Sequence, residues 1–358
     1  MNKLSSKHFI FFIFSTIMIA IRSYSSIFIR LGGKDTWIIS FFAFFCIFLY
    51  FIYLLKICIS TNTFDIDTIF LSNSPKVLSY IMLLLFALGL FLVSVEASTT
   101  FSSSIHTNFF LKTPTWYCLL FMLVPSTYII LRKFNTLLIV VIVVTSISIL
   151  GDLLFLLLIV RYLDFSYLFP IMKDAFTLDS LSCFFLILGS LSSVIIAVPF
   201  FKFLSNPNKL IKHSSLALLV SGFFVVSSFV SVISFFGPFR SGNIFYPEFV
   251  QSQRIQIMNF IEFGELFYIF RNVCMWFLKY VLATYGILIL FKDSIKNKTN
   301  FVIIYNIFVF IISVLITRDQ YFFFGLLNYL EYINVLTFIL IPFISFSLYK
   351  IKFKKAQN

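Results

Sequence analysis

Charged residues are scarce in this sequence. Only 11% of the 358 residues are Asp, Glu, Lys or Arg, whereas hydrophobic residues make up 60%. A soluble domain usually carries about 25% charged residues, so this chain has too few polar side chains to cover a surface in water. Much of its surface must therefore face lipid.

The residue patterns of common catalytic and metal sites are also missing. None of the five cysteines forms a C-x-x-C pair, and the three histidines lie far apart in the sequence. There is neither a nucleophile–base pattern nor a nucleotide-binding loop. We therefore expect no enzyme, no disulfide framework, no metal site and no cofactor.

The net charge of +13 is the kind of excess that nucleic-acid-binding proteins carry. Here, however, the basic residues form short clusters between apolar runs, as the signals that orient membrane proteins do. We expect no nucleic-acid partner.

Long apolar runs dominate what is present. A transmembrane helix needs about 20 mostly apolar residues, and ten runs qualify, the first of which is too long for a signal peptide. The sequence thus predicts an all-α integral membrane protein of about ten transmembrane helices. The runs are 8–31, 37–59, 77–100, 114–131, 135–160, 181–204, 211–236, 262–291, 299–317 and 327–349.

The distribution of Lys and Arg predicts the orientation. If the N-terminus is cytoplasmic, the inside segments hold about twice as many basic residues as the outside segments, which favours two cytoplasmic termini. The longest outside segment joins the seventh and eighth runs and carries Glu248. Its part near 247–258 is interpreted as a loop or as a helix lying at the membrane interface.

Several ionisable residues fall inside the apolar runs, where each costs about 2.5–3.5 kcal/mol on insertion scales. Arg22, Glu96, Asp152 and Arg271 are expected at similar depth in the outer half of the bundle, which suggests that they neutralise one another. The alternative is that these groups only hold the helices together, or reach the interface as long arginine side chains can. The remaining ionisable residues are Lys279, nearer the middle, Glu262 and Glu265 at the start of the eighth run, and Glu331 near the start of the tenth.

Hydroxyl and glycine residues interrupt three runs, at 21–26, 94–100 and 188–193. Gly weakens a helix, and Ser can bond the backbone groups that a break releases. Interruptions at corresponding places in two halves of a chain are typical of transporter binding sites. The first and sixth runs have this relation, which predicts repeats over about 8–160 and 181–349 within one domain, 1–358. Close helix packing by small residues is the alternative explanation.

Short motifs, in order along most of the chain, resemble the B-subunit family of spore germinant receptors (the GerAB/GerKB type), within the amino acid–polyamine–organocation transporter superfamily. The motifs include G-K-D-T-W-I and T-P-T-W before two helices, and an acidic-aromatic segment followed by Lys279. They occupy residues 33–38, 113–116, 164–170, 206–209, 246–247 and 265–267.

The chain also departs from the pattern of that family. The family's Gly-rich break in the first helix is replaced by Ile19–Arg22. Ser190 stands where a glutamate often precedes Pro199, and Arg271 stands where the family is usually apolar. These changes leave the ligand and any coupling ion open.

The resemblance implies a LeuT-type 5+5 inverted-repeat bundle in the inner spore membrane or cell membrane. It implies a subunit that senses a small nutrient such as an amino acid, triggers germination, and works with A and C subunits. A secondary transporter of amino acids or other small solutes is the alternative, and a purely structural subunit is a third possibility. From the polar interruptions, the candidate ligand-binding residues are Arg22, Ser23, Tyr24, Ser25, Glu96, Gly189, Ser190, Ser193 and Lys279.

Overall fold

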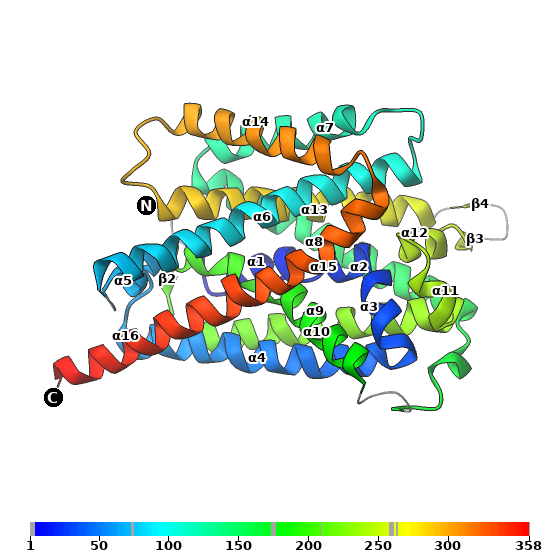
Figure 1. The fold of residues 1–358 in the computed structure, drawn as a ribbon, viewed down its shortest axis with the longest axis horizontal. Helices are drawn as coiled ribbons and strands as arrows, with labels where there is room; N and C mark the ends of the chain where they lie inside the picture. Colours follow the sequence, from blue (N-terminus) through cyan, green and yellow to red (C-terminus); the bar gives the residue numbers. More distant parts are fainter. Residues whose placement is uncertain are drawn as a thin grey trace.

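The computed structural model describes residues 4–72, 75–172, 177–207, 209–257, 261–262 and 264–357. The chain forms a bundle of helices that run mostly along its longest axis (Figure 1). The strands of the described chain are two or three residues long and lie before or between helices. β1 Leu4–Ser5 pairs in parallel with β2 Leu204–Asn206, and β3 Gln256–Ile257 pairs antiparallel with β4 Ile261–Glu262. The predicted all-α class is confirmed.

The predicted spans correspond to helices in the described part of the chain. Eight helical segments are long and apolar enough to cross a membrane, and two shorter apolar segments, Phe9–Ser23 and Thr115–Leu131, occupy the first and fourth predicted positions. The protein is therefore a multi-pass membrane protein. The α-helices are α1 Phe9–Ile17, α2 Ile19–Ser23, α3 Ser26–Gly32, α4 Thr36–Thr61, α5 Ile66–Leu71, α6 Lys76–Asn108, α7 Thr115–Leu131, α8 Phe134–Ile159, α9 Leu178–Leu191, α10 Leu210–Phe236, α11 Pro238–Gly242, α12 Pro247–Ser252, α13 Gly264–Leu290, α14 Lys298–Ile316, α15 Gln320–Asn334 and α16 Ile341–Gln357.

Several 3-10 helices and one π-helix complete the fold of the described residues. The long 3-10 helix η4 continues α9, and the π-helix η5 joins α15 to α16. Both are uncommon at this length, and departures from α-helical geometry often mark functional segments. These segments are η1 Gly33–Asp35, η2 Val160–Tyr162, η3 Phe165–Leu168, η4 Ser192–Phe203 and η5 Val335–Leu340.

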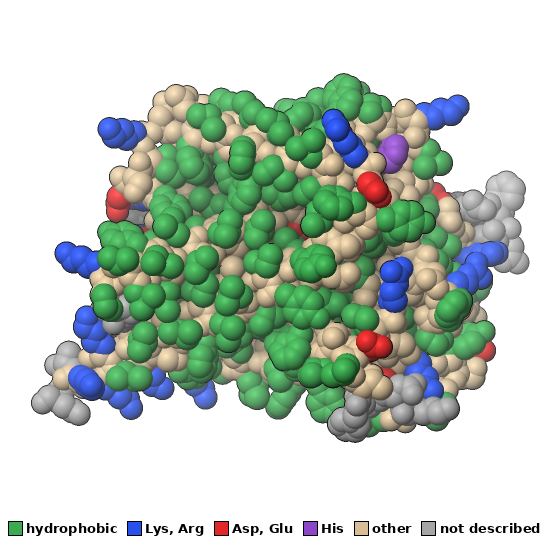
Figure 2. All heavy atoms as spheres, viewed as in Figure 1, with side chains coloured by type: hydrophobic (Ala, Val, Ile, Leu, Met, Phe, Trp, Pro, Cys, Tyr) green, Lys and Arg blue, Asp and Glu red, His purple; other side chains and the backbone are tan. Residues whose placement is uncertain are grey.

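The surface fits a membrane environment. Hydrophobic side chains cover the middle of the face in Figure 2, and most charged side chains lie toward the two ends. Ile304, Ile307, Phe308 and Ile311 of α14 are exposed, as expected of a peripheral helix in lipid. By contrast, α13 is largely buried and contacts α6, α8 and η4, so its polar residues face protein.

The first and sixth predicted spans are interrupted, as their sequences suggested. The first divides into α1, α2 and α3, and the backbone at Tyr24 leaves the helical region (φ −123°, ψ 45°). In the sixth, α9 gives way to η4 at Ser192, and Pro199 lies within η4. The two spans touch where Ser193 Oγ donates to the carbonyl of Thr16, 2.8 Å away.

Both ends of the described chain lie at one end of the bundle (Figure 1). The N-terminal strand β1 pairs with β2, directly after η4. Near the other terminus, Lys352 donates to the carbonyl of Ser72, at the end of α5. We refer to this end as the inner end and to the opposite one as the outer end.

Three boundary predictions were wrong. The segment after Tyr246 is neither a loop nor an interfacial helix, because Pro247, Glu248 and most of α12 are buried in the bundle. The eighth span begins at Gly264, with Glu265 in its first turn, and Glu262 lies in β4. The tenth span begins at Gln320, capped by Asp319, which places Glu331 well inside the helix.

Candidate functional site

Four side chains meet beside the interruption of the first span. Tyr24 Oη donates to Glu96 Oε1 at 2.6 Å and lies 3.0 Å from Glu331 Oε1. Lys279 Nζ contacts both oxygens of Glu96, at 2.9 and 3.0 Å. All four residues are at most 3% exposed. Tyr24, Glu96, Lys279 and Glu331 are called the central cluster below.

The break in the first span positions Tyr24 between the other elements of the cluster. Glu96 comes from α6, Lys279 from α13 and Glu331 from α15. Ionisable groups at such burial are costly unless they are paired. Here Glu96 accepts from Tyr24 and Lys279, whereas Glu331 accepts from Asn334 and lies within hydrogen-bond distance of Tyr24 Oη. The cluster therefore joins three helices and the break in the first span, which come from distant parts of the sequence.

The charges of the central cluster do not balance. It holds two carboxyl groups and one amine, and the amine pairs with Glu96. Within the described part of the chain, no cation forms an ion pair with Glu331. A buried, unpaired carboxylate is strongly disfavoured, so this position suits a proton or a positively charged group of a ligand.

A layer of neutral polar groups borders the central cluster. The Nε1–H of Trp276 lies 3.0 Å from Ser23 Oγ and 3.1 Å from Asn272 Oδ1. Asn272 in turn donates to Ser104 of α6 at 2.6 Å. The ring of Trp276 stacks on Tyr24 at 6.1 Å and lies 5.0 Å from Lys279 Nζ. Thus Ser23 belongs to this layer and does not contact the charged groups directly.

The remaining polar residues at the two interruptions differ in their surroundings. The hydroxyls of Ser25 and Ser190 are buried and have no hydrogen-bond partner among the described residues. The hydroxyl of Ser193, by contrast, donates a hydrogen bond to the carbonyl of Thr16 in the first span. Gly189 lies against the backbone of Glu331, since a Cβ at Gly189 would be 2.1 Å from that carbonyl oxygen. Two unsatisfied hydroxyls remain for a ligand or water.

Arg22 lies in a separate ion-pair network. It contacts Asp152 at 2.8 Å and Glu248 at 3.1 Å, and Arg271 contacts the same two carboxylates. Two positive and two negative groups balance in this outer network, which Ser228 also joins through Glu248. The predicted pairing of Arg22, Arg271 and Asp152 is thus present, but Glu96 was wrongly included, and Glu248 takes its place.

A cavity of about 330 Å³ opens between α3, α11 and α15 toward the outer end. It is called the vestibule. Ser26 lines it two residues after Tyr24, and Asn328 lines it one helical turn before Glu331. The buried Oδ1 atom of Asn328 has no hydrogen-bond partner in the part of the chain that the structure describes. The vestibule is therefore lined by two of the segments that carry the central cluster.

Sequence reasoning missed Glu331 and Glu248 as members of these clusters. Glu331 was noted as intramembrane but was placed near a helix end, because the start of that helix was predicted seven residues late. Glu248 was assigned to an outside loop. No excess of arginines signalled Glu248, because Arg22 and Arg271 already balanced Glu96 and Asp152 among the intramembrane residues expected at that depth.

In a comparison with known protein families, residues 3–323 match the family described as spore germination protein. The chain belongs to the spore germination protein family. No curated protein matches the sequence of this spore germination protein. The family is a permease-type membrane family and not a known enzyme family, and the match agrees with the resemblance inferred from the motifs. Among the described residues, no group of three His, Cys, Asp or Glu side chains is arranged to hold a metal ion.

Proposed function

We propose that this spore germination protein is the membrane subunit of a germinant receptor and that it senses a small nutrient such as an amino acid. The observation that carries the proposal is the central cluster, which has one more carboxyl group than it has cations. Its position beside two interrupted helices supports ligand binding there, because such interruptions expose backbone groups in transporter-like bundles.

The chemistry of the site favours an amine. An ammonium group between Glu96 and Glu331 would supply the missing positive charge and would bond the carboxylates that Tyr24 already bridges. The ligand's carboxylate would meet the backbone N–H groups at the breaks and the unpartnered hydroxyls of Ser25 and Ser190. A zwitterionic amino acid satisfies both requirements.

The other candidate residues support this site from a distance. Ser23 orients Trp276, and Ser193 holds the two interrupted spans together. Gly189 allows α9 to approach Glu331 closely. Arg22 forms ion pairs with Asp152 and Glu248. We therefore propose that Arg22 holds the helices together on the outer side of the site and does not contact the ligand.

Binding is proposed to occur from the outer side through the vestibule. A ligand shifts a conformational equilibrium only by its different affinities for the two states. An amine bound between α6 and α15 would stabilise the arrangement in which these helices stay close. We propose that the A and C subunits of the receptor detect that arrangement, and that two repeats, about 8–160 and 181–349, move relative to each other.

The proposed location is the inner spore membrane, with both termini in the cytoplasm. The Lys and Arg distribution supports this orientation, and both termini lie at the same end of the bundle, as two termini on one side of the membrane require (Figure 1). In this orientation the vestibule faces outward, toward arriving nutrients.

The test is germination of spores that lack this chain, against a panel of amino acids and other nutrients. Loss of the response to one nutrient class, with normal spore formation and rescue by the intact gene, supports the proposal. An unchanged response to every nutrient contradicts it. Uptake of the same nutrients into proteoliposomes separates sensing from the alternative function, secondary transport.

A further inference from the structure

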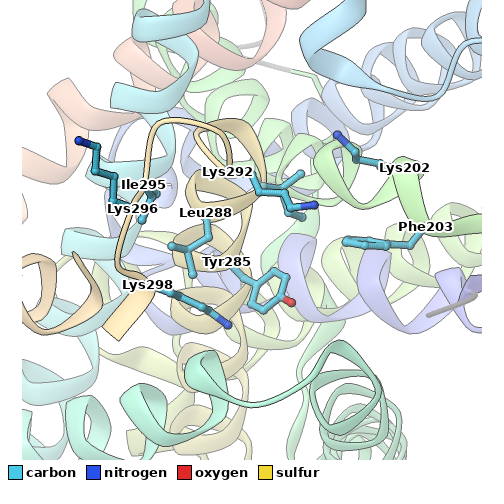
Figure 3. A pocket seen from close by; sticks show the side chains of 9 residues that line it. Lys202, Phe203, Tyr285, Leu288, Lys292, Ile295, Lys296 and Lys298 are labelled. Carbon is cyan, nitrogen blue, oxygen red and sulfur yellow. The ribbon is translucent and has the colours of Figure 1, made fainter. Parts of the chain in front are cut away.

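A second cavity, of about 470 Å³, lies at the inner end, away from the central cluster. It is lined by the end of α13, by the loop that leads into α14 and by the end of η4 (Figure 3). Phe203, Tyr285, Leu288, Ile289 and Ile295 give it apolar walls. Four lysines complete the lining: Lys202, Lys292, Lys296 and Lys298.

Among the residues that the structure describes, three of these four lysines have no carboxylate partner. Lys202 lies 2.8 Å from Asp65 and 3.9 Å from Asp67, so its charge is compensated. In the described part of the chain, Lys292, Lys296 and Lys298 form no ion pair. The cavity therefore has a net positive lining.

The backbone holds these lysines in an ordered loop. The N–H groups of Ser294 and Ile295 both donate to the carbonyl of Phe291, at 3.0 Å. Asn297 then caps α14 by accepting from the N–H groups of Thr299 and Asn300. Lysines on an ordered backbone lose less entropy on binding an anion than lysines on a flexible tail do.

The start of α14 adds to the positive potential. Lys298 is the first residue of this helix, and its first turn contains no acidic residue. The N-terminal end of a helix carries a partial positive charge, so a lysine there is unfavourable unless an anion lies nearby. Lys298 Nζ instead lies 5.2 Å from the ring of Tyr285, within the cavity shown in Figure 3.

We propose that this inner cavity binds a phosphate-bearing anion. Lys292 and Lys298 hold the phosphate, with Lys296 at the same loop, and the apolar walls hold the adjoining carbon groups. Basic cavities between helices on the cytoplasmic side of membrane proteins suit the phosphate of lipid headgroups. The same chemistry also fits a soluble phosphate, and the two sources are separated by experiment.

The experiment uses the full-length protein in nanodiscs of neutral phosphatidylcholine. Native mass spectrometry measures binding of added phosphatidylglycerol, and thermal unfolding measures the effect of inorganic phosphate. The test variant is Lys292→Gln/Lys298→Gln. The matched control is Lys354→Gln/Lys355→Gln, which removes the same charge from exposed lysines of α16.

Each lysine near an anionic headgroup contributes about a fivefold gain in affinity. The test variant should therefore bind phosphatidylglycerol about 25-fold more weakly than the wild type, while the control should bind as the wild type does. Binding of the lipid without an effect of inorganic phosphate identifies a headgroup site. Stabilisation by phosphate, and competition with the lipid, identifies a soluble anion.

Two results would overturn the proposal. One is wild-type binding of phosphatidylglycerol no tighter than that of a neutral lipid, together with no stabilisation by phosphate. The other is an equal loss of binding in the control variant. If the double variant does not fold, the single variant Lys292→Gln, at an exposed position, provides the same comparison.

Discussion

Gly189 of α9 lies directly against the backbone carbonyl of Glu331 in α15. A Cβ at this glycine would be 2.1 Å from the carbonyl oxygen and 2.7 Å from the carbonyl carbon, closer than any real side chain lies. Glycine permits backbones to approach in this way inside membranes. The contact joins the sixth span to the helix that carries one carboxylate of the central cluster.

Substitution of Gly189 is therefore predicted to separate the two helices. We expect Gly189→Ala to lower the free energy of unfolding by about 1–3 kcal/mol, the usual cost of overpacking. Thermal unfolding of the purified protein measures the change. Gly151→Ala is the matched control, because a Cβ there meets only Phe267, at 3.9 Å, and Ala favours a helix. Equal effects of the two substitutions would refute the close contact.

The vestibule is predicted to be the ligand's route to the central cluster. Gly325 lines it, and a Cβ at this position would meet no atom within 4 Å. Gly325→Trp should fill the vestibule and shift the germination dose response to higher nutrient concentrations, whereas Gly325→Ala should leave it unchanged. The measurement is the rate of germination against nutrient concentration. A normal response from spores carrying Gly325→Trp would mean that the nutrient takes another route.

Glu96 and Lys279 are predicted to stabilise the protein only as a pair. Glu96→Gln leaves the ammonium of Lys279 buried without its carboxylate, and breaking a buried pair costs about 3–5 kcal/mol. The double variant Glu96→Gln/Lys279→Met removes both charges and should recover much of this loss in thermal unfolding. A double variant that is no more stable than Glu96→Gln would show that the pair is not coupled.

Asp67, outside the membrane-spanning segments, gives a pH prediction. Burial raises the pKa of its carboxyl from 3.8 to about 6, and the charge of Asp65 adds to the rise, while Lys202 opposes it. Because the folded-state pKa is raised, protonated Asp67 favours folding below the unfolded pKa, and this contribution is lost as the pH rises through about 6.

The melting temperature of the wild type, relative to Asp67→Asn, should therefore be higher at pH 4.5 than at pH 7.5. Groups that do not interact with Asp67 contribute equally in both proteins, so the difference reports on Asp67 and its immediate neighbours. A difference that stays constant over this range, or that changes in the opposite direction, would show that this carboxyl is not shifted.

Much of the architecture was predictable, because lipid imposes strong constraints on sequence. The apolar runs located the spans, and Gly, Ser and charged residues located the interruptions at Tyr24 and Ser192. The helix starts after Asp35 and Pro114 were also predicted. Hydropathy alone, however, predicts the start of α15 seven residues late, because the run 327–349 already supplies the roughly 20 apolar residues that a span needs.

The partners of the buried charges were harder to predict. Depth along a helix suggested that Glu96 and Arg22 pair, but depth does not determine which direction a side chain faces. Glu96 faces Lys279, and Arg22 faces Asp152 and Glu248. The short helix that carries Glu248 is too short and too polar to be recognised as buried, although Arg22 and Arg271 require a second carboxylate.

The most direct test of the account is the germination dose response of spores carrying Glu331→Gln. This change removes the charge that is proposed to bind an amine. Asn334, whose Oδ1 atom is without a partner within the described ranges, can rotate to bond the new amide. Glu265→Gln, on the outer surface beside Gln253, is the matched control. We predict that Glu331→Gln folds normally but needs far more nutrient, whereas the control responds as the wild type does. A wild-type dose response from Glu331→Gln would contradict the proposed site.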